Sequence, residues 1–152
     1  MSRRLQLHEA RPDPAGWARS LADSLRSLVG GRHAKGPVAI DLRDDLPDAL
    51  AIPRTLEAAA CGICEAALDN AIRHSAARRV TVELAVRHGR LIVRIADDGI
   101  GFEPAAHDAG SGGLGRMDEC ARRGGGRLDL RSAPGAGTCV SALFPLAAGQ
   151  PA

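Results

Sequence analysis

Aromatic side chains are almost absent from this 152-residue sequence. They make up 2% of it, there is no Tyr, and Trp17 is the single Trp. The core must therefore be built from Leu, Val, Ile and Ala. Proteins that bind single-stranded nucleic acid stack the bases on aromatic rings, so their scarcity argues against that class. A formal net charge of +2 is also too small to indicate a nucleic-acid partner or an anionic membrane surface.

Long apolar runs are absent as well. No stretch approaches the ~20 apolar residues that cross a bilayer, and the first ten residues, MSRRLQLHEA, contain no hydrophobic region typical of a signal peptide. We therefore expect a cytoplasmic protein whose segment makes no membrane contact. The length suits one domain over residues 1–152, with a core from about residue 13 to 145 and a frayed tail over residues 146–152.

Cysteine is scarce and offers one suggestive spacing. Cys61 and Cys64 are separated by two residues, as in redox or zinc-binding pairs, and Cys120 and Cys139 stand apart. However, the pair lies inside an Ala-rich helical pattern, and no second pair has ligand spacing. Small buried thiols are the better interpretation.

Hydrophobic periodicity predicts three helices: from Pro14 to a stop at Gly30-Gly31, from about Pro53 to His74, and from Leu114 to Arg123. Alternating patterns predict strands at Arg4–Leu7, Val38–Leu42, Val80–Val86, Leu91–Ala96, around Leu128 and Leu130, and at Thr138–Phe144. Phe102–Ser111 has no period and is expected to be a mobile loop. This order predicts an α+β two-layer sandwich, with helices on one face of a mixed, mostly antiparallel sheet.

Three glycine clusters follow one another in the second half of the chain: Asp97–Gly101 (DDGIG), Gly110–Gly115 (GSGGLG) and Gly135–Thr138 (GAGT). Each alone is typical of an ordinary turn. Together, and with an acidic pair at the entry, they favour a nucleotide pocket, because glycine lets backbone N–H groups approach a phosphate. A helix that begins at Leu114 would add its positive end.

The end of the long helix carries a second group of polar side chains. Asn70 lies at the edge of the expected buried stripe, His74 follows one turn later, and Arg73 is beside them. An amide oxygen suits Mg²⁺, and Arg73 and His74 suit phosphate oxygens. A helix that simply ends in polar residues is the alternative.

Taken together, these motifs resemble those of the Bergerat-fold (GHKL) ATPases, which include sensor histidine kinases, gyrase and MutL. The resemblance covers about Asp13 to Pro145, and it is greatest to the catalytic domain of nitrate-sensor-type histidine kinases. It implies that Asn70 binds Mg²⁺, that Asp97 accepts a hydrogen bond from the adenine amino group, and that Phe102–Gly112 forms a lid over ATP. It further implies supporting roles for Gly99, Gly101 and Thr138 at the base and for Gly113, Leu114 and Gly115 at the phosphates.

The sequence departs from this family in two places. Relatives usually carry a Glu four residues before the Asn, where this chain has Ala66, and Glu65 points about 140° away from Asn70 on an ideal helix. The phosphoacceptor hairpin of such kinases is also missing. His8 superficially resembles a phosphoacceptor, but Pro12 and Pro14 follow at once, so we interpret it as an exposed strand residue.

The resemblance implies a protein histidine kinase domain of a two-component system, with ATP and Mg²⁺ as cofactors. It would transfer the γ-phosphoryl group of ATP to a His on a separate dimerisation domain, and would serve a response regulator indirectly. A stand-alone anti-sigma-factor serine kinase is one alternative. A nucleotide-binding module without transferase activity, suggested by Ala66, is the other.

Overall fold

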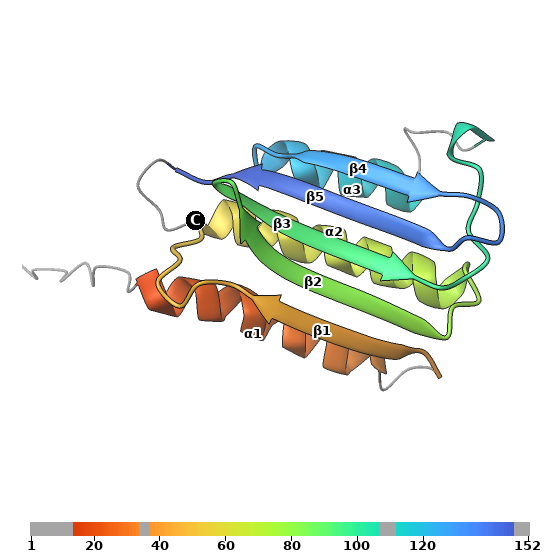
Figure 1. Cartoon of the computed structure of the whole chain (residues 1–152), viewed down its shortest axis with the longest axis horizontal. Coiled ribbons are helices and arrows are strands. Elements are labelled where there is room, and N and C mark those ends of the chain that lie inside the picture. Colours follow the sequence, from red (N-terminus) through yellow and green to blue (C-terminus); the bar gives the residue numbers. More distant parts are fainter. Residues whose placement is uncertain (1–13, 34–36, 107–111, 148–152) are drawn as a thin grey trace, which may run out of the picture.

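A computed structural model describes residues 14–33, 37–106 and 112–147. Within these ranges the chain forms one five-stranded sheet with three α-helices packed behind it (Figure 1). The helices are α1 (Pro14–His33), α2 (Arg54–Arg73) and α3 (Gly112–Arg123), with a short 3₁₀ turn at Pro104–Ala106. The strands are β1 (Ala39–Asp45), β2 (Arg79–Arg87), β3 (Arg90–Asp97), β4 (Arg127–Ser132) and β5 (Thr138–Pro145). The predicted α+β sandwich is confirmed.

The sheet has the strand order β1-β2-β3-β5-β4. β1 and β2 are parallel because α2 connects them as a crossover, and every other neighbouring pair is antiparallel. Asp97 at the end of β3 pairs with Thr138 at the start of β5. The pairing of β3 with β5 therefore brings the first and third glycine clusters together at one end of these two strands.

The core lies between the sheet and the helices. Alternate residues of β2 and β3 are buried, as the period of two predicts. They face the stripe of α2, whose seven expected members are all buried: Leu56, Ala60, Ile63, Cys64, Ala67, Leu68 and Ala71. Aliphatic side chains of this kind, with Phe144, fill the interior.

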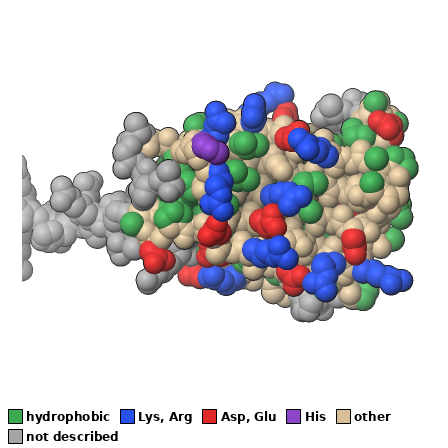
Figure 2. Space-filling model, in the orientation of Figure 1, with side chains coloured by type: hydrophobic (Ala, Val, Ile, Leu, Met, Phe, Trp, Pro, Cys, Tyr) green, Lys and Arg blue, Asp and Glu red, His purple; other side chains and the backbone are tan. Residues whose placement is uncertain are grey.

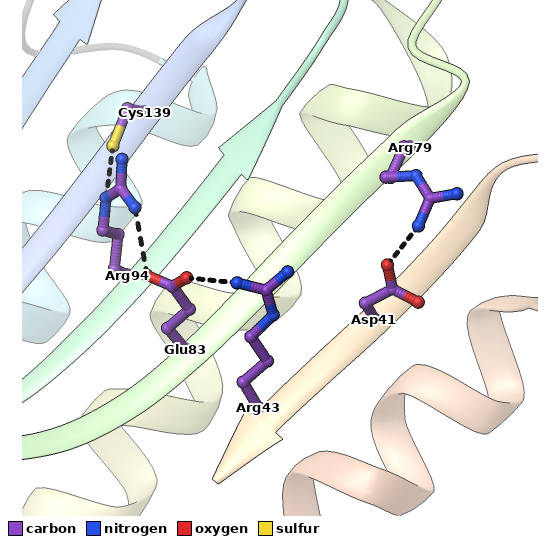
Figure 3. A network of polar contacts seen from close by, with 6 residues as sticks. All are labelled: Asp41, Arg43, Arg79, Glu83, Arg94 and Cys139. Carbon is purple, nitrogen blue, oxygen red and sulfur yellow. Dashed lines mark hydrogen bonds and ion pairs between the residues drawn. The ribbon is translucent and has the colours of Figure 1, made fainter. Parts of the chain in front are cut away.

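The other face of the sheet is polar. Figure 2 shows Lys and Arg side chains interspersed with Asp and Glu across it, and Figure 3 shows one network in detail. Glu83 accepts hydrogen bonds from Arg43 and Arg94, at 3.3 and 3.0 Å, and the Arg94 Nε–H donates to Cys139 Sγ at 3.2 Å. Opposite charges alternate there, so this face carries no field of one sign.

α1 is longer than predicted, because it continues through Gly30-Gly31 to His33. A helical glycine costs only ~1 kcal/mol relative to Ala, which tertiary contacts can offset. Here Arg32 in the last turn forms ion pairs with Glu65, at 3.3 Å, and with Asp69 on α2. The stop at the two glycines was therefore wrong.

Two other boundaries differ. α3 begins at Gly112 rather than Leu114, since Gly112 has a φ of 70° and turns the chain into the helix. β1 runs on to Asp45, beyond the end predicted at Leu42. The predicted strand Arg4–Leu7, His8, the tail after residue 147, and residues 107–111 of the predicted lid lie outside the described residues. No helix in the described ranges combines the length and apolarity that a membrane span requires.

Candidate nucleotide-binding site

A cavity of about 490 Å³ lies at the end of β3 and the start of β5, where the glycine clusters meet. The end of α2, the end of β3, the start of β5 and the first turn of α3 surround it. Seven of the predicted site residues line it: Asn70, His74, Asp97, Gly101, Gly113, Leu114 and Thr138. The structure thus brings together residues that are up to 68 positions apart in the chain (138 − 70).

Apolar side chains form much of the cavity wall. Ile95 and Val140 come from the sheet, Met117 from α3 and Ala67 from α2. Ile100 also lines the cavity, and its exposed fraction is 59%. Among the described residues it is the large hydrophobic residue that is exposed to solvent. Walls of this kind suit a flat, largely apolar group with a few polar atoms at its edge.

Asp97 is the carboxylate of this cavity. Its Oδ1 accepts a hydrogen bond from Gly99 N–H at 2.9 Å. Burial raises the pKa of the carboxyl above its ordinary value of 3.8, and hydrogen bonds from Gly99, Thr138 and the Ser75 side chain oppose part of that rise. The group is a half-buried acceptor that can meet a donor on a ligand.

Asp98, the second member of the acidic pair, has a structural role. Its Oδ1 accepts hydrogen bonds from the N–H groups of Arg78 and Arg79, at 2.8 and 2.9 Å. These bonds hold the pKa of the carboxyl below its ordinary value. Asp98 therefore fixes the start of β2 and is not among the residues that line the cavity.

Ser75 was missed from the sequence, although it lines the cavity and is 8% exposed. Its hydroxyl donates to the Ala71 carbonyl at 2.7 Å, and its own carbonyl accepts from Ile100 N–H at 2.7 Å. A Cβ on Gly99 would lie 2.2 Å from that carbonyl oxygen. Gly99 is thus required for this contact, and it does not line the cavity itself. The spacing of Ser75 four residues after the buried Ala71 was the available signal.

Gly101 closes the loop against the turn between β4 and β5. Its φ is 62°, and a Cβ there would lie 2.0 Å from the Ala133 carbonyl oxygen. Ser132, also missed from the sequence, ties the same turn together: its hydroxyl accepts from Phe102 N–H at 3.0 Å and lies 2.9 Å from Thr138 Oγ1. Thr138 is therefore placed beside Asp97 by both its strand register and this hydroxyl pair.

Asn70 lies opposite, at the half-buried edge of α2, and α3 comes close to it. A Cβ on Gly113 would lie 2.8 Å from Asn70 Oδ1, so glycine is what allows this approach. The first four N–H groups of a helix have no partner within it, and Gly113, Leu114 and Gly115 belong to that turn of α3. Gly115 lines neither this cavity nor the smaller one beside it.

A smaller cavity of about 260 Å³ adjoins the first and shares the lining residues Asn70, His74, Gly112 and Gly113 with it. Arg73 lines only this smaller cavity, together with Ala66, Asp69 and Arg116. Ala66 is buried, whereas Glu65 points elsewhere and pairs with Arg32 and Arg116, at 3.3 and 3.1 Å. The position four residues before Asn70 therefore carries no carboxylate.

The described residues contain no group of three or more His, Cys, Asp or Glu side chains arranged to hold a metal ion. Cys61 and Cys64 are both free thiols. Burial, with help from Glu57 and Glu65, raises the pKa of Cys61 to about 11, and burial raises that of Cys64 further. Such thiols are poor nucleophiles and metal ligands at neutral pH, which agrees with the interpretation of small packing residues.

Comparisons with known proteins agree with this geometry. Sensor histidine kinase LiaS of Bacillus subtilis strain 168 is 34% identical over 128 residues, which cover 84% of this chain and 35% of LiaS. Sensor protein VraS of Staphylococcus saprophyticus is 32% identical over 130 residues, which cover 84% of this chain and 36% of VraS. The chain thus spans about a third of the length of these relatives.

Solved structures share the fold. The blue-light activated histidine kinase of Erythrobacter litoralis EL346 superposes with a TM-score of 0.71 at 20% identity, over 83% of this chain and 42% of that one. The histidine kinase AdeS of Acinetobacter baumannii gives 0.63 at 18% identity, over 84% and 64%. Residues 57–148 match the family described as histidine kinase-, DNA gyrase B-, and HSP90-like ATPase, and these residues include Asn70, Asp97 and the cavity around them. The chain belongs to this ATPase family.

Proposed function

We propose that this chain is the ATP-binding catalytic part of a sensor histidine kinase, and that it acts on a His of a separate dimerisation domain. The observation that carries the proposal is a pair of adjoining cavities. The half-buried Asp97 carboxylate lines the larger, mostly apolar one, and Asn70, which lies against the first turn of α3, lines both. That order matches a nucleotide, with a flat base at one end and phosphates at the other.

Asp97 would accept the hydrogen bond from the adenine amino group. Gly99 and Gly101 let its loop close against Ser75 and Ala133, and Thr138 flanks it from β5. Ile95, Met117 and Val140 would contact the faces of the base. A bound base would displace water from these walls, so its polar contact with Asp97 would contribute to discrimination between bases.

The phosphates would lie at the first turn of α3, where Gly113, Leu114 and Gly115 offer N–H groups and the helix dipole favours negative charge. Arg73 and His74 lie on the facing side, at the end of α2. The donor set would suit Mg²⁺ with a single protein ligand: Asn70 Oδ1 would hold the ion, and phosphates and waters would complete the shell. The metal would supply charge neutralisation between phosphate oxygens.

In the transfer itself, a nitrogen of the substrate His bonds to the γ-phosphorus and the bond to the β–γ bridging oxygen breaks, which leaves ADP. The residues of this chain act by positioning the phosphates and stabilising their charge. A response regulator would receive the phosphoryl group from the His in a later step.

The test has two stages. Calorimetry should first show binding of ATP that strengthens with Mg²⁺. The chain is then mixed with a separately produced dimerisation domain of a sensor kinase and ATP labelled at the γ-phosphate, and label should appear as acid-labile phosphohistidine. No ATP binding would refute the proposal, and acid-stable phosphoserine on an added partner would indicate the serine-kinase alternative.

One feature favours a second candidate, a nucleotide-binding module without transferase activity. The buried Ala66 leaves the position four residues before Asn70 without a carboxylate that could orient water or the metal shell. ATP binding with no label transfer to the dimerisation domain that naturally pairs with this chain would support this candidate. Transfer above the background of an Asp97→Asn variant would exclude it.

A further inference from the structure

Arg116 is a cation at the phosphate end that the proposed chemistry does not yet use. It lies on α3 one turn after Gly112 and lines the smaller cavity with Asn70 and His74. Its Nη2 lies 3.1 Å from Glu65 Oε2, and its side chain is 54% exposed. The guanidinium is thus held at the wall of a cavity by one partially exposed partner.

We propose that Arg116 binds the terminal phosphate of ATP and is the residue by which this chain prefers ATP over ADP. This inference rests on the proposed function and adds a specificity-determining residue to it. On nucleotide binding the guanidinium leaves Glu65 and donates to oxygens of the outermost phosphate.

The position of the smaller cavity indicates which phosphate is bound. It adjoins the larger cavity, with which it shares Asn70, His74, Gly112 and Gly113, whereas Asp97 lines only the larger one. With the base at Asp97 and the chain of phosphates passing Asn70, the group that reaches the smaller cavity is the last phosphate. ADP lacks that group.

The charge around the smaller cavity is favourable for an anion. Its ionised lining residues are Arg73, Arg116 and Asp69, and Asp69 is already paired with Arg32 from α1. Ala66 contributes only a methyl group to the wall. No unpaired carboxylate among these lining residues therefore opposes a phosphate or competes for Arg116 on this side.

Breaking the ion pair between Arg116 and Glu65 requires little free energy. Partially exposed ion pairs contribute little to stability, and Glu65 keeps Arg32 as a partner at 3.3 Å. A guanidinium binds phosphate through two parallel hydrogen bonds, which are stronger than one contact to an exposed carboxylate. The exchange of Glu65 for phosphate is therefore favourable.

The test compares ATP with ADP. Affinities of a non-hydrolysable ATP analogue and of ADP are measured by calorimetry with Mg²⁺ for the parent chain and for Arg116→Ala. We expect roughly a tenfold loss of affinity for the analogue and less than about a twofold loss for ADP. Arg116→Gln, which keeps an unbranched polar side chain but removes the guanidinium and its charge, gives the same comparison if the Ala variant does not fold.

Arg122→Ala is the matched control. Arg122 lies on the same helix, is 77% exposed, and pairs with Asp118 at i,i+4 away from both cavities. Its loss should leave both affinities unchanged. Glu65→Gln removes the competing partner of Arg116, so affinity for the analogue should stay equal or rise.

The outcomes separate the two levels of the proposal. If the parent binds neither nucleotide, the proposed function fails and the inference fails with it. If the parent prefers the analogue and Arg116→Ala keeps that preference, or loses both nucleotides equally, only the role of Arg116 is refuted. A fall in analogue affinity in Glu65→Gln would also overturn it, since Glu65 would then be needed in the bound state.

Discussion

Asp97 and Asp98 are neighbours with opposite environments. The Asp97 carboxyl is turned into the cavity, where burial raises its pKa, whereas Asp98 is solvent-exposed and two backbone N–H groups lower its pKa. The two adjacent carboxylates differ because Asp97 is the last residue of β3, whereas Asp98 follows the strand and accepts hydrogen bonds from the start of β2. Asp97 is the member that can recognise a ligand.

Asp97→Asn should weaken nucleotide binding. The substitution keeps the size but turns an acceptor oxygen into a donor that faces the adenine amino group, and such a buried mismatch costs ~1–3 kcal/mol. We expect the affinity for ATP or ADP, measured by calorimetry, to fall at least roughly tenfold. Unchanged affinity in a variant that unfolds cooperatively would remove Asp97 from the base-binding role.

Gly101→Ala should destabilise the fold more than Gly135→Ala. Both residues have positive φ, of 62° and 80°, but a Cβ meets the Ala133 carbonyl oxygen at Gly101 and nothing within 4 Å at Gly135. Positive φ alone costs Ala ~1 kcal/mol, and the clash should add at least ~1 kcal/mol at Gly101. Urea unfolding of the two variants measures the difference, and equal losses would show that the loop shifts to relieve the contact.

At the scale of elements, the site depends on how closely α2 and α3 approach. Glycine at position 113 lets the first turn of α3 lie against the Asn70 amide, and Met117 and Ala121 bury the inner face of α3. Glu65 joins all three helices, since it pairs with Arg32 on α1 and Arg116 on α3. The proposed phosphate end is therefore a helix–helix junction, whereas the proposed base end lies against the strands β3 and β5.

This division predicts how Asn70→Ala behaves. Loss of the amide oxygen should remove the Mg²⁺-dependent part of ATP binding, because that oxygen is the one protein ligand in the proposed shell. Weak binding through Asp97 should remain, since the base end does not involve Asn70. The measurement is ATP affinity with and without Mg²⁺, and a variant that gains as much from the metal as the parent does would contradict the assignment.

At the scale of the whole molecule, the helices cover one face of the sheet and the site occupies its edge. Ionisation of the Asp97 carboxyl destabilises the unliganded folded state, because burial raises the pKa of this group above its ordinary value of 3.8. Folding then favours the protonated form, so this group stabilises the fold least at neutral pH. The proposed role in base recognition would therefore use a charge that destabilises the unliganded fold.

The pH dependence of global unfolding tests the different environments of Asp97 and Asp98. The stabilities of Asp97→Asn and Asp98→Asn, each relative to the parent, should change with pH in opposite directions. The raised pKa of Asp97 means that stability falls as pH rises from 3.8 through the folded-state value, so Asp97→Asn should become more stable relative to the parent as pH rises. The lowered pKa of Asp98 means that its contribution is present above 3.8 and is lost as pH falls, so Asp98→Asn should become less stable relative to the parent as pH rises.

Urea unfolding of the parent and both variants, from about pH 3 to about pH 7, gives the two slopes across the carboxylate range. Slopes of the same sign would show that the two carboxyls do not differ in environment as described.

The periodic segments were predictable because their patterns are local. The stripe of α2 and the alternation of β2 and β3 follow from the spacing of apolar residues, which one element is enough to set. The same holds for Asn70 at the edge of its helix and for the need for glycine in the DDGIG loop. Asn70, Asp97 and the glycine clusters could be named in advance for this reason, although their roles stay predictions.

Other features depended on contacts between distant segments. The sequence alone could not extend α1 past Gly30-Gly31, because Arg32 finds its partners 33 and 37 residues later on α2. It could not select Ser75 or Ser132, whose hydroxyls matter only where loops meet. Nor could it place Arg116 at the phosphate end, since the packing of α3 against α2 creates that cavity. Local pattern determined the elements and the polar residues they present, and tertiary packing decided which of those residues face one another.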